Sequence, residues 1–319
     1  MDTAAAAFAA YLESPGLLAA PPWSDPSLFA QQVLSGIASG SGFAILALAI
    51  VLIYRSTSIL NFAQGEMAMF STFLAWTFMT RMDFWPAFFL AIIVAMAIGA
   101  SLELFILRRV EQAPVLNSLI VTLGLFTMFN GLALWIWGSQ PKGFGPFSVF
   151  SGQAVCVSDI CIGRASLGIL AGGGVIMVLL YALFQFTKVG LAMRATAQNR
   201  LASQLVGIPV GRMLTLGWAL SAGAGAVAGL LISQNFGLTT STFLPILLFA
   251  FAAAVVGGLD SPVGAIAGGL LIGVVRNMAG TYVPSDVGSV DLTVAFVVIV
   301  LVLMLRPTGI FGRGVARRV

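Results

Sequence analysis

The sequence KVGLAMRATAQNRLASQLVGIPVGR, residues Lys188–Arg212, is a long polar interruption in an otherwise apolar chain. It carries four basic residues and no Asp or Glu, and apolar segments lie on both sides of it. Its middle part, Leu191–Val206, is predicted to be a short helix. Gly207-Ile208-Pro209 is expected to end that helix, because glycine caps helices and proline cannot continue one. Since Lys and Arg are retained on the cytoplasmic side of membranes, the segment is predicted to be cytoplasmic.

Composition identifies a membrane protein. The mean hydropathy is +1.04, with 59% hydrophobic and only 8% charged residues, whereas about a quarter of residues are charged in soluble domains. The net charge of +4 is therefore no sign of nucleic-acid binding. The chain has no His and only two Cys, too few for an imidazole or cysteine metal site. We expect neither a metal nor a cofactor.

Apolar segments follow one another along the chain at lengths near the 20 residues that cross a bilayer. They lie near Val33–Ile53, Ser58–Thr80, Phe84–Leu107, Val115–Trp137, Ala165–Phe186, Met213–Ser233, Phe243–Val256, Val263–Ala279 and Leu292–Leu305. The seventh is short, and Gly257–Pro262 separates it from the eighth, so this pair is either two spans or a re-entrant hairpin. The predicted fold is an all-α, polytopic transmembrane bundle of about eight to nine spans.

Charge predicts the orientation. The arginines of the tail, beginning with Arg306, place the C-terminus inside. Each predicted span crosses the membrane once, so counting spans back from the C-terminus places 188–212, Arg108-Arg109 and Arg55 inside as well. Three segments then lie outside, namely Asp2–Asp25, Thr281–Asp291 and the loop Gly138–Arg164. The chain divides into an external N-terminal extension (1–32), a transmembrane domain (33–313) that contains the 188–212 segment, and a basic cytoplasmic tail (314–319).

Two breaks in the apolar pattern are candidates for a transport pathway. The run Asn61–Glu66 puts polar side chains inside a span, where Gly65 permits local unwinding. A satisfied interhelical hydrogen-bond knot explains the run equally well. The Gly257–Pro262 break leaves backbone groups that must face protein or water, and paired interruptions indicate a pathway. The predicted pathway residues are Asn61, Phe62, Gln64, Gly65, Glu66, Gly257, Gly258 and Asp260. Glu103 is instead expected to form a local ion pair with Arg108.

Cys156 and Cys161 fall in the predicted external loop. An oxidising compartment favours a local disulfide between them over two free thiols.

The chain shows no means of supplying its own energy. Its only lysines, Lys142 and Lys188, stand in no Gly-x-x-x-x-Gly-Lys-[Ser/Thr] motif, so it cannot bind ATP by a P-loop. No His exists and the carboxylates are isolated, which disfavours a membrane enzyme and a gradient-driven carrier or channel, the alternative function. The pattern favours a pathway protein whose energy arrives from another subunit. The 188–212 segment is then a docking helix, not merely a loop that sets topology.

Three motifs resemble the permease family of ATP-binding-cassette importers for branched-chain amino acids. Residues 58–69, SILNFAQGEMAM, are similar to the family's Asn-Phe-Ala-x-Gly-[Glu/Asp] signature. Residues 190–195, GLAMRA, with Ala202 and Gly207-Ile208, are similar to its cytoplasmic coupling segment. Residues 257–265, GGLDSPVGA, resemble its Gly-Gly-x-Gly-Ser turn, with Asp260 replacing the commoner Gly. The resemblance runs from about Val33 to Arg313.

The resemblance implies a multi-pass permease of the bacterial inner membrane, with an all-helical fold like that of vitamin-B12-type importers. It implies as partners two cytosolic ATP-binding subunits, a second related permease chain and an external solute-binding protein, besides membrane lipid. The solute is a small polar molecule, a branched-chain amino acid or a relative such as another amino acid or urea. The coupling residues that it implies are Gly190, Arg194, Ala195, Ala202, Gly207 and Ile208.

Overall fold

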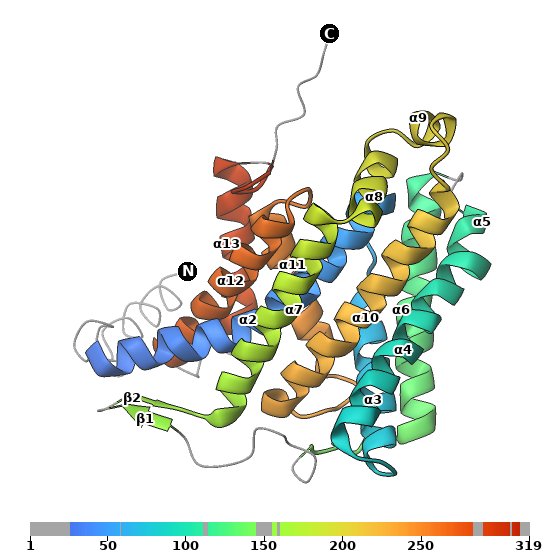
Figure 1. Ribbon diagram of the computed structural model, residues 1–319. Coiled ribbons are helices and arrows are strands. Elements are labelled where there is room, and N and C mark those ends of the chain that lie inside the picture. Colours follow the sequence, from blue (N-terminus) through green and yellow to red (C-terminus); the bar gives the residue numbers. More distant parts are fainter. Residues whose placement is uncertain are drawn as a thin grey trace, which may run out of the picture.

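The computed structural model describes residues 26–57, 59–110, 114–144, 155–157, 160–282, 290–306 and 308–312, and almost all of them are helical (Figure 1). The helices are α2 (Pro26–Thr57), α3 (Gln64–Met79), α4 (Phe84–Leu102), the π-helical turn η1 (Glu103–Leu107), α5 (Arg108–Val110), α6 (Val115–Trp137), α7 (Arg164–Phe186), α8 (Lys188–Gln198), α9 (Arg200–Leu205), α10 (Val210–Phe236), α11 (Phe243–Gly257), α12 (Pro262–Tyr282) and α13 (Val290–Leu305). The strands β1 (Val155–Val157) and β2 (Ile160–Ile162) pair antiparallel. The predicted all-α transmembrane bundle is confirmed, with this small hairpin added.

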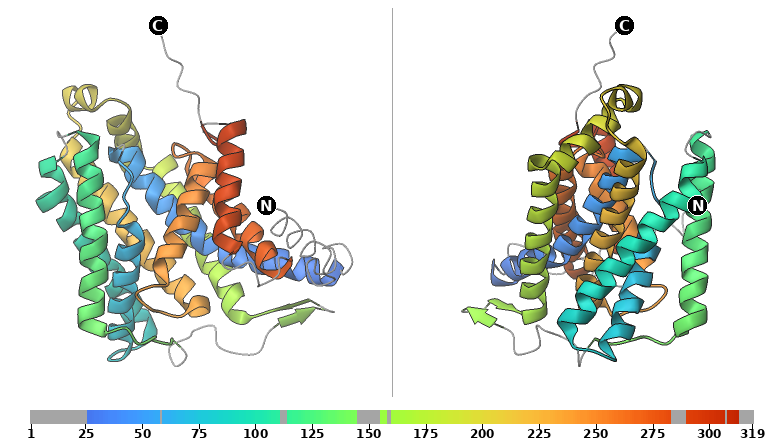
Figure 2. Two further views of the ribbon diagram at one scale, coloured as in Figure 1. Left: turned by 180° about the vertical axis from the view of Figure 1, so that it is seen from behind. Right: turned by 45° about the vertical axis from the view of Figure 1, so that its right-hand side comes forward.

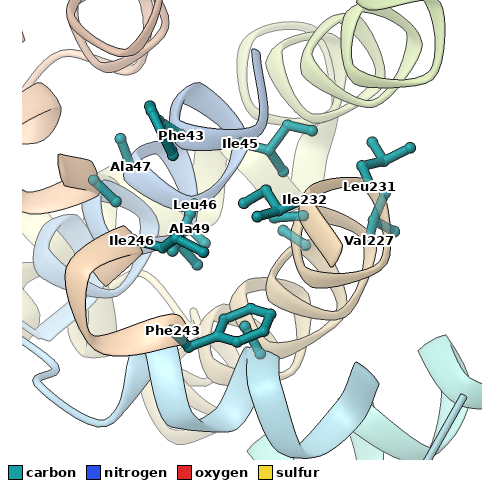
Figure 3. Close-up of a cluster of buried hydrophobic side chains, with 14 of the residues drawn as sticks. Phe43, Ile45, Leu46, Ala47, Ala49, Val227, Leu231, Ile232, Phe243 and Ile246 are labelled. Atoms are coloured by element: carbon teal, nitrogen blue, oxygen red, sulfur yellow. The ribbon is translucent and has the colours of Figure 1, made fainter. Parts of the chain in front are cut away.

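Helix α2 is the centre of the bundle. Every residue from Gly40 to Ile53 is buried, and the helix packs against α12, α10, α7 and α11. The views of Figure 2 show it crossing the molecule obliquely between these neighbours. Figure 3 shows how the core is built, with Phe43 and Ile45 of α2 near Ile232 of α10 and Ile246 of α11. The apolar composition of this stretch on all sides suits its burial on all sides.

Small residues allow α2 and α12 to lie very close together. A Cβ atom added at Gly40 would lie 2.8 Å from the carbonyl oxygen of Gly269, and one at Gly36 would lie 2.6 Å from the Cα atom of Val274. In lipid, where burying apolar surface against other apolar surface gains little, such close approach is what holds helices together.

Helix α3 is shorter than its predicted span. Residues 59–63 are not helical, and α3 begins only at Gln64. The side-chain oxygen of Asn61 accepts a hydrogen bond from the backbone amide of Ala63 (3.0 Å), and such local bonds compete with helix formation. The predicted span near Ser58–Thr80 is therefore helical only from Gln64 to Met79, and its predicted start was wrong.

Six helices in the described part of the chain are long and apolar enough to cross a membrane: α2, α4 with its extension through η1 and α5, α6, α7, α10 and α12. Helices α3, α11 and α13 have 16, 15 and 16 residues, which is short for a 30 Å hydrocarbon layer. The count of eight to nine spans stays a prediction. The pair over 243–279 is two separate helices, α11 and α12, that pack against each other.

The basic segments gather at one end of the bundle, as their predicted common compartment requires. Arg200 donates to the carbonyl of Thr57, at the end of α2 (3.4 Å), and Arg108 donates to the carbonyl of Gly211 (3.1 Å). In Figure 1 this end carries α5, α8 and α9, while the β1–β2 hairpin lies at the opposite end. We call the first the docking end.

Candidate functional site

The docking end is built around two short helices where the sequence predicts one. Helix α8 begins at Lys188 and ends at Gln198, and α9 covers Arg200–Leu205. Asn199 breaks the segment because its backbone is extended (φ −155°, ψ 104°). Its side-chain oxygen accepts a hydrogen bond from the amide of Ala202 (3.0 Å), as in an N-cap. The prediction of a single helix over Leu191–Val206 was therefore wrong in its interior and at its start.

The predicted end of the segment is confirmed. Gly207 has φ +84°, a conformation that glycine adopts at little cost. Its amide donates to the carbonyl of Gln204 (3.0 Å), and the amide of Ile208 donates to the carbonyl of Ser203 (2.9 Å). This pair of bonds is a Schellman motif, which satisfies the last carbonyls of α9.

The inner face of α8 is fixed to the end of α7. A Cβ atom at Gly190 would collide with the carbonyl groups of Leu183 and Phe184, so glycine is required there. The guanidinium of Arg194 donates to the side-chain oxygen (3.2 Å) and to the carbonyl (3.3 Å) of Gln185. Two of the predicted coupling residues, Gly190 and Arg194, thus tie the segment to its own bundle.

The outer face of α9 exposes large apolar side chains. Leu201 is 68% exposed, Leu205 81% and Val206 76%, and Ala202 is exposed beside them. Ala195 and Ile208 are only half-buried. An exposed apolar strip on an otherwise polar segment is typical of a surface that contacts a protein partner or a membrane.

A charged network joins η1 to the start of α10, directly after the docking segment. The Glu103 side chain is 3% exposed, and its carboxylate accepts two bonds from Arg108, at 3.1 and 2.9 Å. It accepts a third from the hydroxyl of Thr215 (2.6 Å). The predicted ion pair is therefore confirmed. Bidentate pairing with both carboxylate oxygens occupied is the geometry in which a buried charge is tolerated.

Asn61 and Gln64 form a buried knot between helices. Both side chains are fully buried, and the Asn61 amide donates to the Gln64 side-chain oxygen (3.2 Å). Gln64 in turn donates to the carbonyl of Ser221 in α10 (3.0 Å), and the Ser221 hydroxyl lies 2.8 Å from the carbonyl of Ala49 in α2. The run Asn61–Glu66 was interpreted either as part of a transport pathway or as an interhelical hydrogen-bond knot. For Asn61 and Gln64 the structure shows the knot.

Glu66 takes part in a separate polar node. It is 1% exposed, and one carboxylate oxygen accepts a hydrogen bond from the side-chain amide of Asn130 in α6 (3.2 Å). The same amide donates to the carbonyl of Thr240, just before α11 (3.1 Å). The other oxygen, Oε1, has no hydrogen-bond partner among the described residues. Asn130 therefore joins the first turn of α3 to the residues just before α11.

The Gly257–Asp260 turn lies far from Glu66, at the docking end. Gly258 has φ +101°, and the amides of Ile310 and Phe311 donate to the carbonyls of Val256 (2.8 Å) and Gly257 (3.1 Å). The backbone left open by the break is thus satisfied by residues 308–312. The predicted pathway residues do not form one cluster. Asn61, Gln64, Gly65 and Glu66 are buried in the bundle, Phe62 packs on Phe251 of α11, and the turn lies beside α8.

Cys156 and Cys161 lie directly opposite each other in the β1–β2 pair. Opposite Cα atoms in antiparallel strands are about 4.5–5.5 Å apart, within the range that a disulfide spans.

Sequence reasoning missed several partners, chiefly Asn130, Thr240, Ser221 and Thr215. Asn130 carried a usable signal, since it is a carboxamide in the middle of an apolar span, where polar side chains need a partner. Ser221, Thr215 and Thr240 carried none, because hydroxyl residues are common in membrane helices and Thr240 contributes only its carbonyl.

A bundle of apolar helices with polar nodes inside and an apolar docking strip at one end defines an integral membrane protein of the permease class.

The family model described as "Branched-chain amino acid transport system / permease component" matches residues 32–305. The chain belongs to this family of permease components. LivH of Salmonella typhimurium, a high-affinity branched-chain amino acid transport system permease protein, is 29% identical over 89% of this chain and 96% of its own. BraD of Pseudomonas aeruginosa has the same identity and coverage. Among solved structures, PsaBC from Streptococcus pneumoniae in complex with Fab matches 87% of this chain and 91% of its own, with a TM-score of 0.46 and 14% identity.

Proposed function

We propose that this permease carries branched-chain amino acids through the inner membrane of a bacterium as part of an ATP-binding-cassette importer. The names and coverage of LivH and BraD support the solute class. Two cytosolic ATP-binding subunits hydrolyse ATP, a second related permease completes the pathway, and an external solute-binding protein delivers the amino acid. In this assignment residues 1–32 are an external extension, 33–313 form the permease domain and 314–319 are a cytoplasmic tail.

The observation that carries the proposal is the exposed strip of α9, formed by Leu201, Ala202, Leu205 and Val206. Leaving such large apolar side chains in water is unfavourable, and burying one against a partner is worth about 1.5–3 kcal/mol. The strip is held rigidly by the cap at Asn199 and the Schellman motif at Gly207. Helix α7 precedes the segment and α10 follows it. Movement of a docked subunit would therefore be transmitted to these two helices.

The test is Ala202→Asp, with Leu205→Asp as a second variant. An unpaired charge in the buried contact costs about 3 kcal/mol, on the order of a hundredfold in affinity. We expect copurification with the ATP-binding subunits and amino-acid uptake to fall together. The permease itself should still insert and fold, because both side chains are exposed.

The matched control is Ser139→Asp, which introduces the same charge at an exposed position of the opposite end, directly after α6. It should alter neither copurification nor uptake. Normal uptake by both α9 variants, or uptake without a nucleotide-hydrolysing subunit, would contradict the proposal.

The pathway itself is assigned to the node of Glu66. It lies inside the bundle, where Asn130 joins the first turn of α3 to the residues just before α11, and helix ends inside a bundle supply polar sites in transporters. Within the node, Oε1 of Glu66 is the acceptor without a hydrogen bond in the described part of the chain. A carboxylate of this kind suits the ammonium group of an amino acid.

A further inference from the structure

A cavity of about 270 Å³ lies behind the docking segment. Its walls come from the ends of α2, α7 and α8, from the 258–261 turn with the start of α12, and from Phe311. Asp260 is a predicted residue of the transport pathway and Arg194 a predicted residue of the coupling surface, and the structure brings both to this one cavity. The volume is just below the ~300–1,000 Å³ of pockets for small molecules, so it fits a small solute and is cramped for a nucleotide.

One wall of the cavity is cationic. Arg55 of α2 and Arg194 of α8 both line it. Gln185 accepts two bonds from the terminal nitrogens of Arg194, which fixes the plane of that guanidinium. A guanidinium has five N–H donors, so Arg194 retains donors for a carboxylate. The first residues of α12, Pro262 and Val263, also line the cavity, and the start of a 21-residue helix adds positive potential.

The other walls are unsuited to a simple anion. Asp260 brings a carboxylate into the same cavity, so the cavity carries both signs of charge. Phe184, Val263 and Phe311 supply apolar surface. A ligand that satisfies all three walls needs an anionic group, a cationic group and a short apolar side chain on one small molecule.

We infer that this cavity is a cytoplasmic binding site for a free, zwitterionic aliphatic amino acid. The carboxylate binds Arg194, the ammonium binds Asp260, and the aliphatic side chain lies on Phe184, Val263 and Phe311.

The site deepens the proposed function and rests on it, because the amino acid that fits is the product released on that side. A ligand held between Arg194 of α8 and Asp260 of the turn joins the docking segment to the start of α12. A ligand shifts an equilibrium only by its differential affinity for the two states. Here it favours the arrangement of the present structure and so slows the movement of α8. High internal amino acid then inhibits its own import.

Binding is measured first, by titrating L-leucine into the purified permease without its solute-binding protein. We expect Asp260→Asn to weaken binding about tenfold or more, as loss of a charge-assisted contact implies. Val263→Asp, at an exposed position of the apolar wall, should weaken it similarly. Asp83→Asn, the same charge change at an exposed residue of the opposite end, should leave it unchanged. The analogues 4-methylpentanoate and 3-methylbutylamine, which each lack one charge, should both bind at least about tenfold more weakly.

Feedback is measured in proteoliposomes that hold the whole importer with ATP enclosed, with and without L-leucine inside. Internal leucine should slow the initial uptake of labelled leucine, and Asp260→Asn should relieve this inhibition. The inference is overturned if Asp260→Asn binds leucine normally, if 4-methylpentanoate binds as well as leucine, or if internal leucine has no effect. Uptake in vesicles without internal leucine tests the proposed function by itself, so the two failures are distinguishable.

Discussion

At the scale of single residues, the contrast between Gln64 and Glu66 separates structure from function. Both side chains are buried in the first turn of α3. Gln64 is neutral, and both ends of its amide have partners in the knot with Asn61 and Ser221. Glu66 is a carboxylate in a membrane helix, where charge is expensive and a neutral side chain would serve packing better. This cost is the physical reason for the role in transport that we propose for Glu66.

Glu66→Gln tests that role. The variant keeps the shape of the side chain and an acceptor for Asn130, and it removes a costly charge. We expect the thermal unfolding midpoint of the purified permease to stay equal or rise. Uptake of the amino acid should fall by about tenfold or more, because a carboxamide binds an ammonium group much less strongly than a carboxylate does. Asp83→Asn serves as the charge-matched control. A variant that transports at the normal rate would show that Glu66 serves packing only.

At the scale of elements, the turn η1 and the start of α10 behave as one unit. π-Helical turns inside α-helices are rare and often lie at functional sites. Here the turn places Glu103 where Arg108, five residues later, can pair with it and also reach Gly211 and Thr215 of α10. The network follows directly after the docking segment, so it links that segment to α4.

Arg108→Met is predicted to lower the stability of the permease strongly. It leaves the Glu103 carboxylate buried with Thr215 as its remaining described partner, at a cost of about 3 kcal/mol. The double variant Glu103→Gln/Arg108→Met should recover part of the loss, because the stranded charge is gone and the effects of contacting residues do not add. Thermal unfolding of the purified protein measures both. Arg109→Met, at the exposed neighbouring position, is the control, and an equal loss there would refute the network.

The β1–β2 hairpin predicts a disulfide. Because Cys156 and Cys161 are opposite partners in the register, the backbone needs no rearrangement to join them. We expect titration of protein purified without reductant to find no free thiol under denaturing conditions, and two after reduction. Two reactive thiols before reduction would rule out the bond.

At the scale of the whole molecule, the two ends of the bundle differ in the way that a fixed orientation requires. The docking end carries Arg55, Arg108 and the 188–212 segment with its apolar strip, and the opposite end carries the hairpin. The orientation predicted from charge is an external N-terminus and a cytoplasmic C-terminus.

Reporter fusions at Ala20 and after Val319 measure this orientation. A reporter that is active only outside should work at Ala20, and one that is active only inside should work after Val319. An external N-terminus and a cytoplasmic C-terminus require an odd number of membrane crossings. Finding both termini in one compartment would refute that number, and one of the short helices α3, α11 and α13 would then not be the membrane crossing that we predict.

The class of fold, most helix boundaries and the position of the polar segment 188–212 could be predicted from the amino-acid sequence. Apolar runs at membrane length have no other stable form than helices, since backbone groups in lipid must bond internally. The sequence could not determine that α3 starts late, that Asn199 divides the docking segment, or that the residues predicted for the pathway fall into separate places. The first two outcomes come from local side-chain bonds of Asn61 and Asn199 that compete with helix formation, and the third depends on partners distant in the chain. Asn61 and Gln64 became a knot because Ser221 lies opposite, and Glu66 became a node because Asn130 and Thr240 do. A polar side chain in an apolar span predicts that a hydrogen-bond partner is present. The identity of that partner depends on how the helices pack, which the local sequence does not specify.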